Sequence, residues 1–113
     1  MTGASARQYG IRFEQELARY FGCTTTRNSR PGLHDDAGDL LIDGVAVEAK
    51  ARHCGTGGTP PRWSIWSWMR DIEQKADPDQ IPCLIVKRPG HSIGRNLIVA
   101  NLEDLHELAR RLA

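Results

Sequence analysis

Residues 38–50 read GDLLIDGVAVEAK, and this stretch predicts two strands joined by a tight turn. Apolar, β-favouring residues stand on both sides of the pair Asp43-Gly44. An Asp-Gly pair between two such runs is typical of a β-hairpin with a two-residue loop. We therefore expect an antiparallel pair of strands that reverses at positions 43–44.

The two-residue loop determines which residues face each other in this hairpin. Counting outward from the loop places Leu40 opposite Val47 and Asp39 opposite Glu48. The pair that flanks such a loop is hydrogen-bonded and the pairs then alternate, so Asp39 and Glu48 are expected to form a non-hydrogen-bonded pair. The Cα atoms of such a pair lie about 4.5 Å apart.

Side-chain alternation adds a lysine to these two carboxylates. Lys50 is two residues after Glu48, so the two side chains project from the same face of the strand. We expect Asp39, Glu48 and Lys50 to converge on one face. The other face is apolar and is expected to face the core, and its members are Leu40, Ile42, Val45 and Val47.

Two opposed carboxylates repel each other, so a bound cation, a raised pKa or an arginine is expected to offset the repulsion. Carboxylate oxygens suit Mg²⁺, and this ion polarises a phosphodiester and lowers the pKa of a bound water. Lys50 is then placed to orient that water or to stabilise charge on the phosphate. The alternative interpretation is a solvated polar face with a surface ion pair between Glu48 and Lys50.

The rest of the chain predicts a mixed α/β domain. Apolar residues recur at helical spacing in three segments, and three further segments favour strands. The expected order is helix, strand, hairpin, helix, two strands and helix. The predicted helices are residues 5–21, 63–76 and 102–112; the predicted strands outside the hairpin are residues 24–28, 82–87 and 96–100; residues 55–61 are expected to form a loop.

The length and amino-acid composition of the chain indicate which class of protein it belongs to. A chain of 113 residues with 40% hydrophobic and 26% charged residues is expected to form one globular domain over residues 1–113. It has no apolar run of the roughly 18 to 20 residues that span a bilayer. It also begins without the apolar segment of a signal peptide, and its three cysteines are widely spaced, so we expect a cytoplasmic protein. The net charge of +1 includes twelve arginines and three lysines, which permits a nucleic-acid partner.

The hairpin residues resemble the PD-(D/E)xK nuclease superfamily, which has the restriction-endonuclease-like fold. Its motif is an acidic residue that enters one strand, followed by Asp/Glu-x-Lys on the next. Here these are Asp39 and then Glu48-Ala49-Lys50, with Gly38 where a proline is usual. The resemblance implies a mixed sheet of about four to five strands flanked by helices, in the order α-β-β-β-α-β-β-α.

Within that superfamily the chain is most similar to archaeal-type Holliday junction resolvases and their phage relatives. Those proteins carry a glycine shortly before a glutamate on the first helix, here Gly10 and Glu14, followed by a turn with arginine and serine, here residues 27–30. They also carry a lysine on the strand after the middle helix, here Lys87. The resemblance covers most of the chain.

The resemblance implies roles for individual residues. Asp39 and Glu48 are expected to bind the metal with help from Glu14 and the backbone carbonyl of Ala49, and Lys50 is expected to position the attacking water. All of these except Ala49 are expected to be catalytic. The residues expected to contact DNA are Arg27, Ser29, Arg30, Arg52, Lys87 and Arg88.

Other residues have structural explanations beside functional ones. Glu16 is expected to be a solvated helix residue. Some relatives place a glutamine, lysine or tyrosine of the middle helix over the active site, but Gln74 and Lys75 here are explained at least as well by a solvated face, because Asp71 and Glu73 lie nearby. The tryptophans are Trp63, Trp66 and Trp68, and at least one is expected to pack in the core.

The sequence therefore predicts an Mg²⁺-dependent endodeoxyribonuclease that cuts branched DNA, with Mn²⁺ able to substitute. A two-fold junction favours a homodimer, and no membrane or small-molecule cofactor is expected. Two alternatives stay open. One is a nuclease for flaps, ends, nicks or RNA, and the other is a non-catalytic DNA-binding protein with a nuclease fold.

Overall fold

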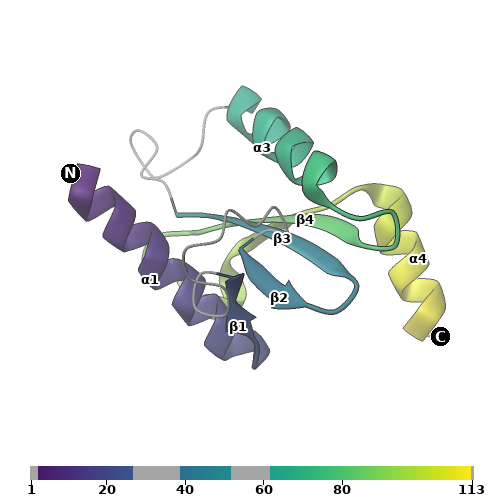
Figure 1. Cartoon of the computed structure of the whole chain (residues 1–113), viewed down its shortest axis with the longest axis horizontal. Helices are drawn as coiled ribbons and strands as arrows, with labels where there is room; N and C mark the ends of the chain where they lie inside the picture. The colour runs from purple at the N-terminus through teal and green to yellow at the C-terminus, as the bar shows by residue number, and fades with distance from the viewer. Residues whose placement is uncertain (1–2, 27–38, 52–61, 113) are drawn as a thin grey trace.

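The computed structural model describes residues 3–26, 39–51 and 62–112, which form a mixed α/β fold (Figure 1). These residues contain a five-stranded open sheet in the order β1-β2-β3-β4-β5. The strands are β1 (Thr24–Thr25), β2 (Leu40–Ile42), β3 (Val45–Lys50), β4 (Ile81–Val86) and β5 (Leu97–Val99). The helices are α1 (Gly3–Phe21), α3 (Arg62–Lys75) and α4 (Leu102–Leu112), with a short 3₁₀ helix η2 (Ile93–Arg95) before β5.

The predicted hairpin is confirmed, together with its register over residues 40–47. Strands β2 and β3 are antiparallel and pair Leu40 with Val47 and Ile42 with Val45. Gly44 takes a φ of +79° in the loop, which a side chain would oppose. The two-residue loop chemistry and the period-two pattern therefore set the strand pairing as expected.

Strands β3 and β4 pair in parallel, with Glu48 opposite Leu84 and Lys50 opposite Val86. A parallel pair needs a crossover connection, and α3 lies between these two strands in the sequence. All other pairings in the sheet are antiparallel. The sheet thus places the ends of β3 and β4 side by side, with Lys50 as the last residue of β3 and Lys87 directly after β4.

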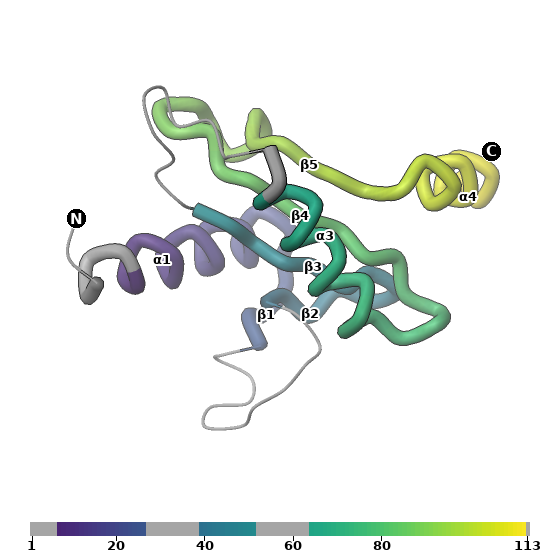
Figure 2. Tube along the Cα trace, turned by 90° about the horizontal axis from the view of Figure 1, so that it is seen from above, coloured from purple at the N-terminus to yellow at the C-terminus, as the bar shows by residue number. Residues whose placement is uncertain are grey.

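Helices cover both faces of the sheet, as the views in Figures 1 and 2 show. One core lies between the sheet and α1, and its fully buried residues include Phe13, Leu40 and Val47. The other core lies between the sheet and α3, and it is built around Ile72 and Leu84. The central strands are therefore buried on both sides.

This two-sided burial corrects the expectation of one apolar and one polar face. Leu40, Ile42, Val45 and Val47 do face the α1 core as predicted. The opposite face of β3 also packs, because Ala46 is fully buried against α3 and Glu48 is only 9% exposed. The physical reason is the parallel β3–β4 pair, whose crossover helix covers the face that an isolated hairpin would leave in water.

The element boundaries lie close to those predicted. The first helix begins two residues earlier than expected and ends at Phe21, followed by Gly22 with a φ of +68°. The middle helix is shifted by one residue and the last helix is as predicted. Residues 55–61, predicted as a loop, lie outside the described residues. Among the helices that the structure describes, none is long and apolar enough to cross a membrane.

Candidate active site

Asp39 lies immediately before β2 and is held by three hydrogen bonds. Its backbone N–H donates to the Val47 carbonyl at 2.7 Å, and its carbonyl accepts from the Thr26 N–H at 3.1 Å. Its carboxylate Oδ2 accepts from the Ala49 N–H at 2.8 Å. The side chain is therefore fixed against the end of β3, where the residues of the Glu-x-Lys motif stand.

The position of Asp39 differs in one respect from the prediction. The ladder of β2 and β3 ends at Leu40 and Val47, so the direct backbone pair predicted for Asp39 and Glu48 is not formed. A regular continuation would leave the Asp39 N–H unbonded to β3, whereas here it bonds to Val47. In a regular hairpin the Ala49 N–H would donate to the backbone carbonyl of the residue before Asp39. Here it donates to the carboxylate of Asp39 instead.

The environment of Asp39 raises the pKa of its carboxyl group to about 6. Burial is the largest cause, and the negative charge of Glu48 is the next. The hydrogen bond from Ala49 lowers the pKa, Glu14 raises it further, and Lys50 lowers it. Three other predicted site residues therefore lie within electrostatic reach of Asp39: Glu48, Glu14 and Lys50.

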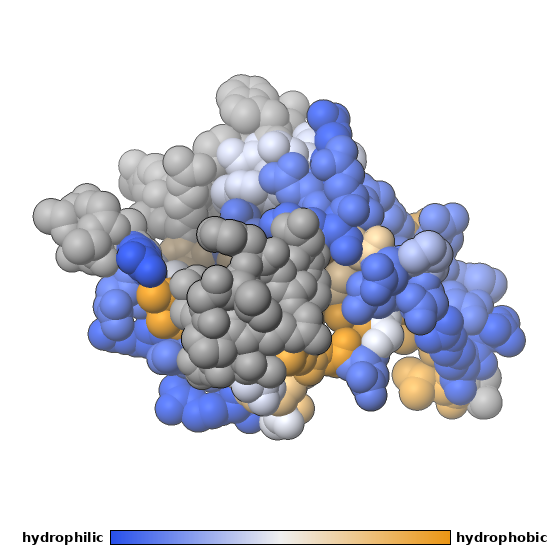
Figure 3. Space-filling view, viewed as in Figure 1, coloured by the Kyte–Doolittle hydropathy of each residue, from blue (hydrophilic) through white to orange (hydrophobic). Residues whose placement is uncertain are grey.

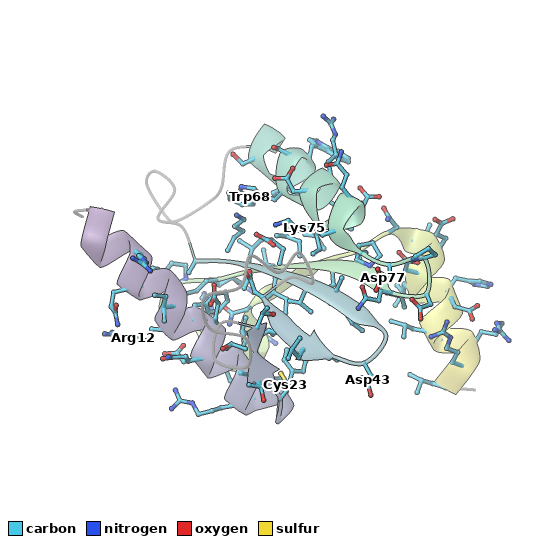
Figure 4. All side chains as sticks on the ribbon, in the orientation of Figure 1. Arg12, Cys23, Asp43, Trp68, Lys75 and Asp77 are labelled. Carbon is cyan, nitrogen blue, oxygen red and sulfur yellow. The ribbon has the colours of Figure 1, made fainter. Side chains whose placement is uncertain are left out.

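Glu48 projects from β3 toward α3, in contact with two lysines. Its Oε1 lies 3.3 Å from Lys50 Nζ, and its Oε2 lies 3.8 Å from Lys75 Nζ. The Lys50 ammonium also lies 5.5 Å from the ring centroid of Trp68, which stabilises its charge. Figure 4 labels Trp68 and Lys75, which reach from α3 toward the sheet.

Lys75 and Trp68 lie beside Glu48 and Lys50. The sequence left Lys75 open between a solvated face and a place over the active site, and it gave Trp68 no place there. Trp68 is buried, as expected for at least one tryptophan, while Trp66 is 70% exposed. The available signal was spacing, because Lys75 follows Trp68 by seven residues and Ile72 by three. Residues at this spacing lie on one face of a helix, and Ile72 marks that face as the buried one.

The carbonyl of Ala49 lies on the side of β3 that faces β2. Along β3 the Val47 carbonyl accepts from Asp39 on one side, and the Lys50 carbonyl accepts from Lys87 on the other. Carbonyls alternate in direction along a strand, so the Ala49 carbonyl lies on the same side as that of Val47. This orientation suits the predicted role of Ala49 as a metal ligand.

Glu14 and Glu16 lie on α1, where they have different surroundings. Glu14 is half-buried and acts on the carboxyl group of Asp39. Glu16 is partly exposed, as expected for a solvated helix residue, and its carboxylate also lies 3.7 Å from Lys87 Nζ. The helix thus directs Glu14 toward Asp39 and Glu16 toward the lysine that follows β4.

The predicted DNA-contact residues are only partly described. Lys87 lies on the α1 side of the sheet, with its ammonium 4.9 Å from the ring centroid of Tyr9 and 5.3 Å from that of Phe13. Arg88 donates through its guanidinium to the Arg95 carbonyl at 3.3 Å. Four predicted DNA contacts lie outside the described residues: Arg27, Ser29, Arg30 and Arg52.

The donors around Asp39 are carboxylate and carbonyl oxygens. Among residues 3–26, 39–51 and 62–112, no group of three or more His, Cys, Asp or Glu side chains is arranged to hold one. The oxygen donors nearest the end of β3 are the carboxylates of Asp39 and Glu48 and the carbonyl of Ala49. Hard oxygen donors suit Mg²⁺, and a cation would offset the charges of Glu48 and Glu14, which add to the effect of burial in raising the pKa of Asp39.

The chain matches no protein-family model, no curated protein and no solved structure. The relation to restriction-endonuclease-like nucleases therefore stays a prediction from the hairpin motif and the order of the elements.

Proposed function

We propose that this chain is a metal-dependent DNA endonuclease with a restriction-endonuclease-like core. The observation that carries the proposal is the placement of Asp39, Glu48 and Lys50 around the end of β3. Asp39 is fixed there through Ala49 at 2.8 Å, and Glu48 and Lys50 are in contact at 3.3 Å. Two carboxylates can hold a metal ion, and a lysine beside them can orient the attacking water or stabilise charge on the phosphate.

Asp39, Glu48 and the Ala49 carbonyl would hold Mg²⁺, with Glu14 adding negative charge from α1. When bound, the ion polarises the phosphodiester and lowers the pKa of its water. The hydrogen bond from Ala49 orients the Asp39 carboxylate before any ligand arrives. Because the Asp39 carboxylate is already oriented, binding of the metal ion does not cost the free energy of ordering this side chain.

Lys50 has the second role in the proposed reaction. Its ammonium is held between the Glu48 carboxylate and the face of Trp68. From there it orients the attacking water or stabilises the negative charge that develops on the phosphate. The motif is complete in Asp39, Glu48 and Lys50, which favours a working enzyme over a DNA-binding protein that has lost catalysis.

Branched DNA is the proposed substrate, on the resemblance to Holliday junction resolvases. A four-way junction has two-fold symmetry, and one domain of 113 residues offers little surface to hold it alone. The proposed enzyme therefore acts as a homodimer on such a substrate. Flaps, ends, nicks and RNA are the alternative substrates.

The proposal is tested by incubating the purified chain with a four-way junction, flap, fork, linear duplex, single strand and RNA. Each substrate is tested with Mg²⁺, Mn²⁺, Ca²⁺ and a chelator. We expect cleavage with Mg²⁺ or Mn²⁺, preference for the junction, and none with the chelator. Cleavage that continues in the chelator contradicts metal dependence. Preference for another substrate means that this substrate replaces the junction as the proposed one.

The site assignment is tested by Asp39→Asn and Glu48→Gln. Both are expected to abolish cleavage and to leave DNA binding largely intact, because loss of negative charge near a phosphate does not weaken attraction. Asp43→Asn is the matched control, since Asp43 is an exposed carboxylate in the loop of the same hairpin. Full cleavage by Asp39→Asn would refute the assignment.

A further inference from the structure

Helix α4 has no buried residue, and it carries an exposed apolar stripe. At 100° per residue its four leucines fall within an arc of about 120°. Their exposed fractions are 82% for Leu102, 61% for Leu105, 38% for Leu108 and 86% for Leu112. All the charged residues of the helix lie outside this arc.

The described part of the chain offers this stripe little cover. Figures 1 and 2 show α4 projecting from the end of the molecule beyond β5. Orange atoms appear in Figure 3 at the lower right, where Figure 1 places the end of α4. An isolated helix of 11 residues is only marginally stable in water, so packing of its apolar face is expected to stabilise it.

The charges of α4 indicate what packs on this face. Its first turn is acidic, with Glu103 and Asp104, and its last turn is basic, with Arg110 and Arg111. Glu107 contacts both arginines, at 2.6 Å and 3.1 Å, which leaves that end with a net positive charge. The helix is therefore complementary to a reversed copy of itself.

We propose that α4 packs against α4 of a second copy of this chain, antiparallel, about a two-fold axis near the middle of the helix. In this arrangement Leu102 of each copy meets Leu112 of the other, and Leu105 meets Leu108. Asp104 of each copy lies on the same flank as Arg111 of the other. A two-fold axis repeats each of these contacts, as an isologous interface requires.

A membrane surface is the other partner that an amphipathic helix suggests. Helices that bind anionic lipid carry an excess of lysine and arginine on the polar face. The polar face of α4 has three acidic residues and two arginines. Its charge pattern thus favours a second copy of the chain.

The test is sedimentation of the full chain in a chelator over about a hundredfold range of concentration, because mass action makes a dimer dissociate on dilution. The chelator keeps the result independent of the proposed nuclease activity. We expect a monomer–dimer equilibrium that Leu105→Glu shifts to monomer. Ile98→Glu is the matched control, because Ile98 is 69% exposed on the edge strand β5, and it is expected to leave the equilibrium unchanged.

Charge reversal tests the antiparallel direction and does not depend on the leucines. Asp104→Arg and Arg111→Glu are each expected to weaken the dimer about 10-fold, since two pairs are lost per dimer. The double variant restores opposite charges and is expected to recover most of the loss. A parallel pair would place like residues together and give no such recovery.

Three outcomes would overturn the proposal. The first is a monomer at every concentration, whether or not α4 binds anionic vesicles. The second is a dimer that Leu105→Glu leaves intact or that Ile98→Glu disrupts instead. The third is a double charge variant that is weaker than both single variants.

Discussion

The carboxylate of Asp39 accepts a hydrogen bond of 2.8 Å from the backbone N–H of Ala49, ten residues later in the chain. This bond joins the acidic residue before β2 to the middle of the Glu-x-Lys motif on β3. It also replaces a strand-to-strand bond, because the regular ladder has ended at Leu40. The hairpin therefore gives up one backbone pairing to fix a carboxylate at the proposed site.

Asp39→Asn is expected to make the metal-free protein more stable at neutral pH. Burial and neighbouring carboxylates raise the pKa of Asp39 from 3.8 to about 6, and this difference corresponds to about 3 kcal/mol for ionising Asp39 in the folded protein. The raised pKa means that the folded state holds the proton more tightly than the unfolded state. The free energy of unfolding of the parent protein should therefore fall as pH rises from about 4 to about 6.

The measurement is denaturant unfolding in a chelator across this pH range. Asp39→Asn should gain about 1–3 kcal/mol over the parent above pH 6 and converge with it below pH 4. Asp43→Asn controls for loss of a carboxylate in an exposed position. A parent protein more stable than Asp39→Asn at neutral pH would show that the carboxylate is stabilised, and the account of its surroundings would then be wrong.

Lys50→Met is expected to lower kcat by about 10²–10³-fold, because Lys50 is proposed to act on the charge that develops during reaction. The folded protein and its metal binding should persist, since the methionine stem fills the same space beside Trp68. Single-turnover cleavage at saturating DNA measures the effect. Cleavage by Lys50→Met at the parent rate contradicts the role.

Lys87→Met separates chemistry from DNA binding. Lys87 follows β4 on the α1 side of the sheet, while Lys50 lies on the α3 side. As a predicted phosphate contact it should change KM and the salt dependence of DNA binding, and it should leave kcat unchanged. A fall in kcat with no change in KM would instead assign Lys87 to the reaction.

Lys75→Gln is expected to tighten binding of Mg²⁺. The ammonium of Lys75 lies 3.8 Å from Glu48 Oε2 and is 38% exposed, so it competes with a cation for that carboxylate in a partly solvated site. Its removal should increase affinity by about 2- to 10-fold at low salt. Lys75→Arg keeps the charge and should bind Mg²⁺ like the parent. Calorimetric titration with Mg²⁺ measures the affinity of each variant. Weaker binding of Mg²⁺ by Lys75→Gln would mean that Lys75 stabilises the metal-binding arrangement of Glu48.

The hairpin and its register could be predicted because their causes are local. The loop residues Asp43 and Gly44 and the period-two pattern lie within one short segment. The same pattern placed Glu48 and Lys50 on one face, where they are in contact. The displacement of Asp39 was not predictable in this way, because its backbone also bonds to Thr26, which lies outside the hairpin segment.

The burial of the candidate site under α3 was harder to predict for a related reason. The face of β3 that bears Glu48 is buried by α3, and this burial follows from the parallel pairing of β3 with β4. Neither strand's own pattern reveals its partner. The contact of Lys75 with Glu48 therefore depends on tertiary packing, and helical spacing alone indicated only that Lys75 shares a face with Ile72.

Gly44→Ala and Gly10→Ala are expected to change stability in opposite directions. A Cβ at either position meets no atom within 4 Å, so neither substitution causes a clash. Gly44 has a φ of +79°, where a side chain costs roughly 1–2 kcal/mol. Gly10 lies inside α1, where alanine gains about 0.5–1 kcal/mol. Denaturant unfolding of both variants measures these changes. Because the register also depends on the packing of Leu40 and Val47, Gly44→Ala should keep its metal binding, and loss of that binding would show that the turn alone holds Asp39 beside β3.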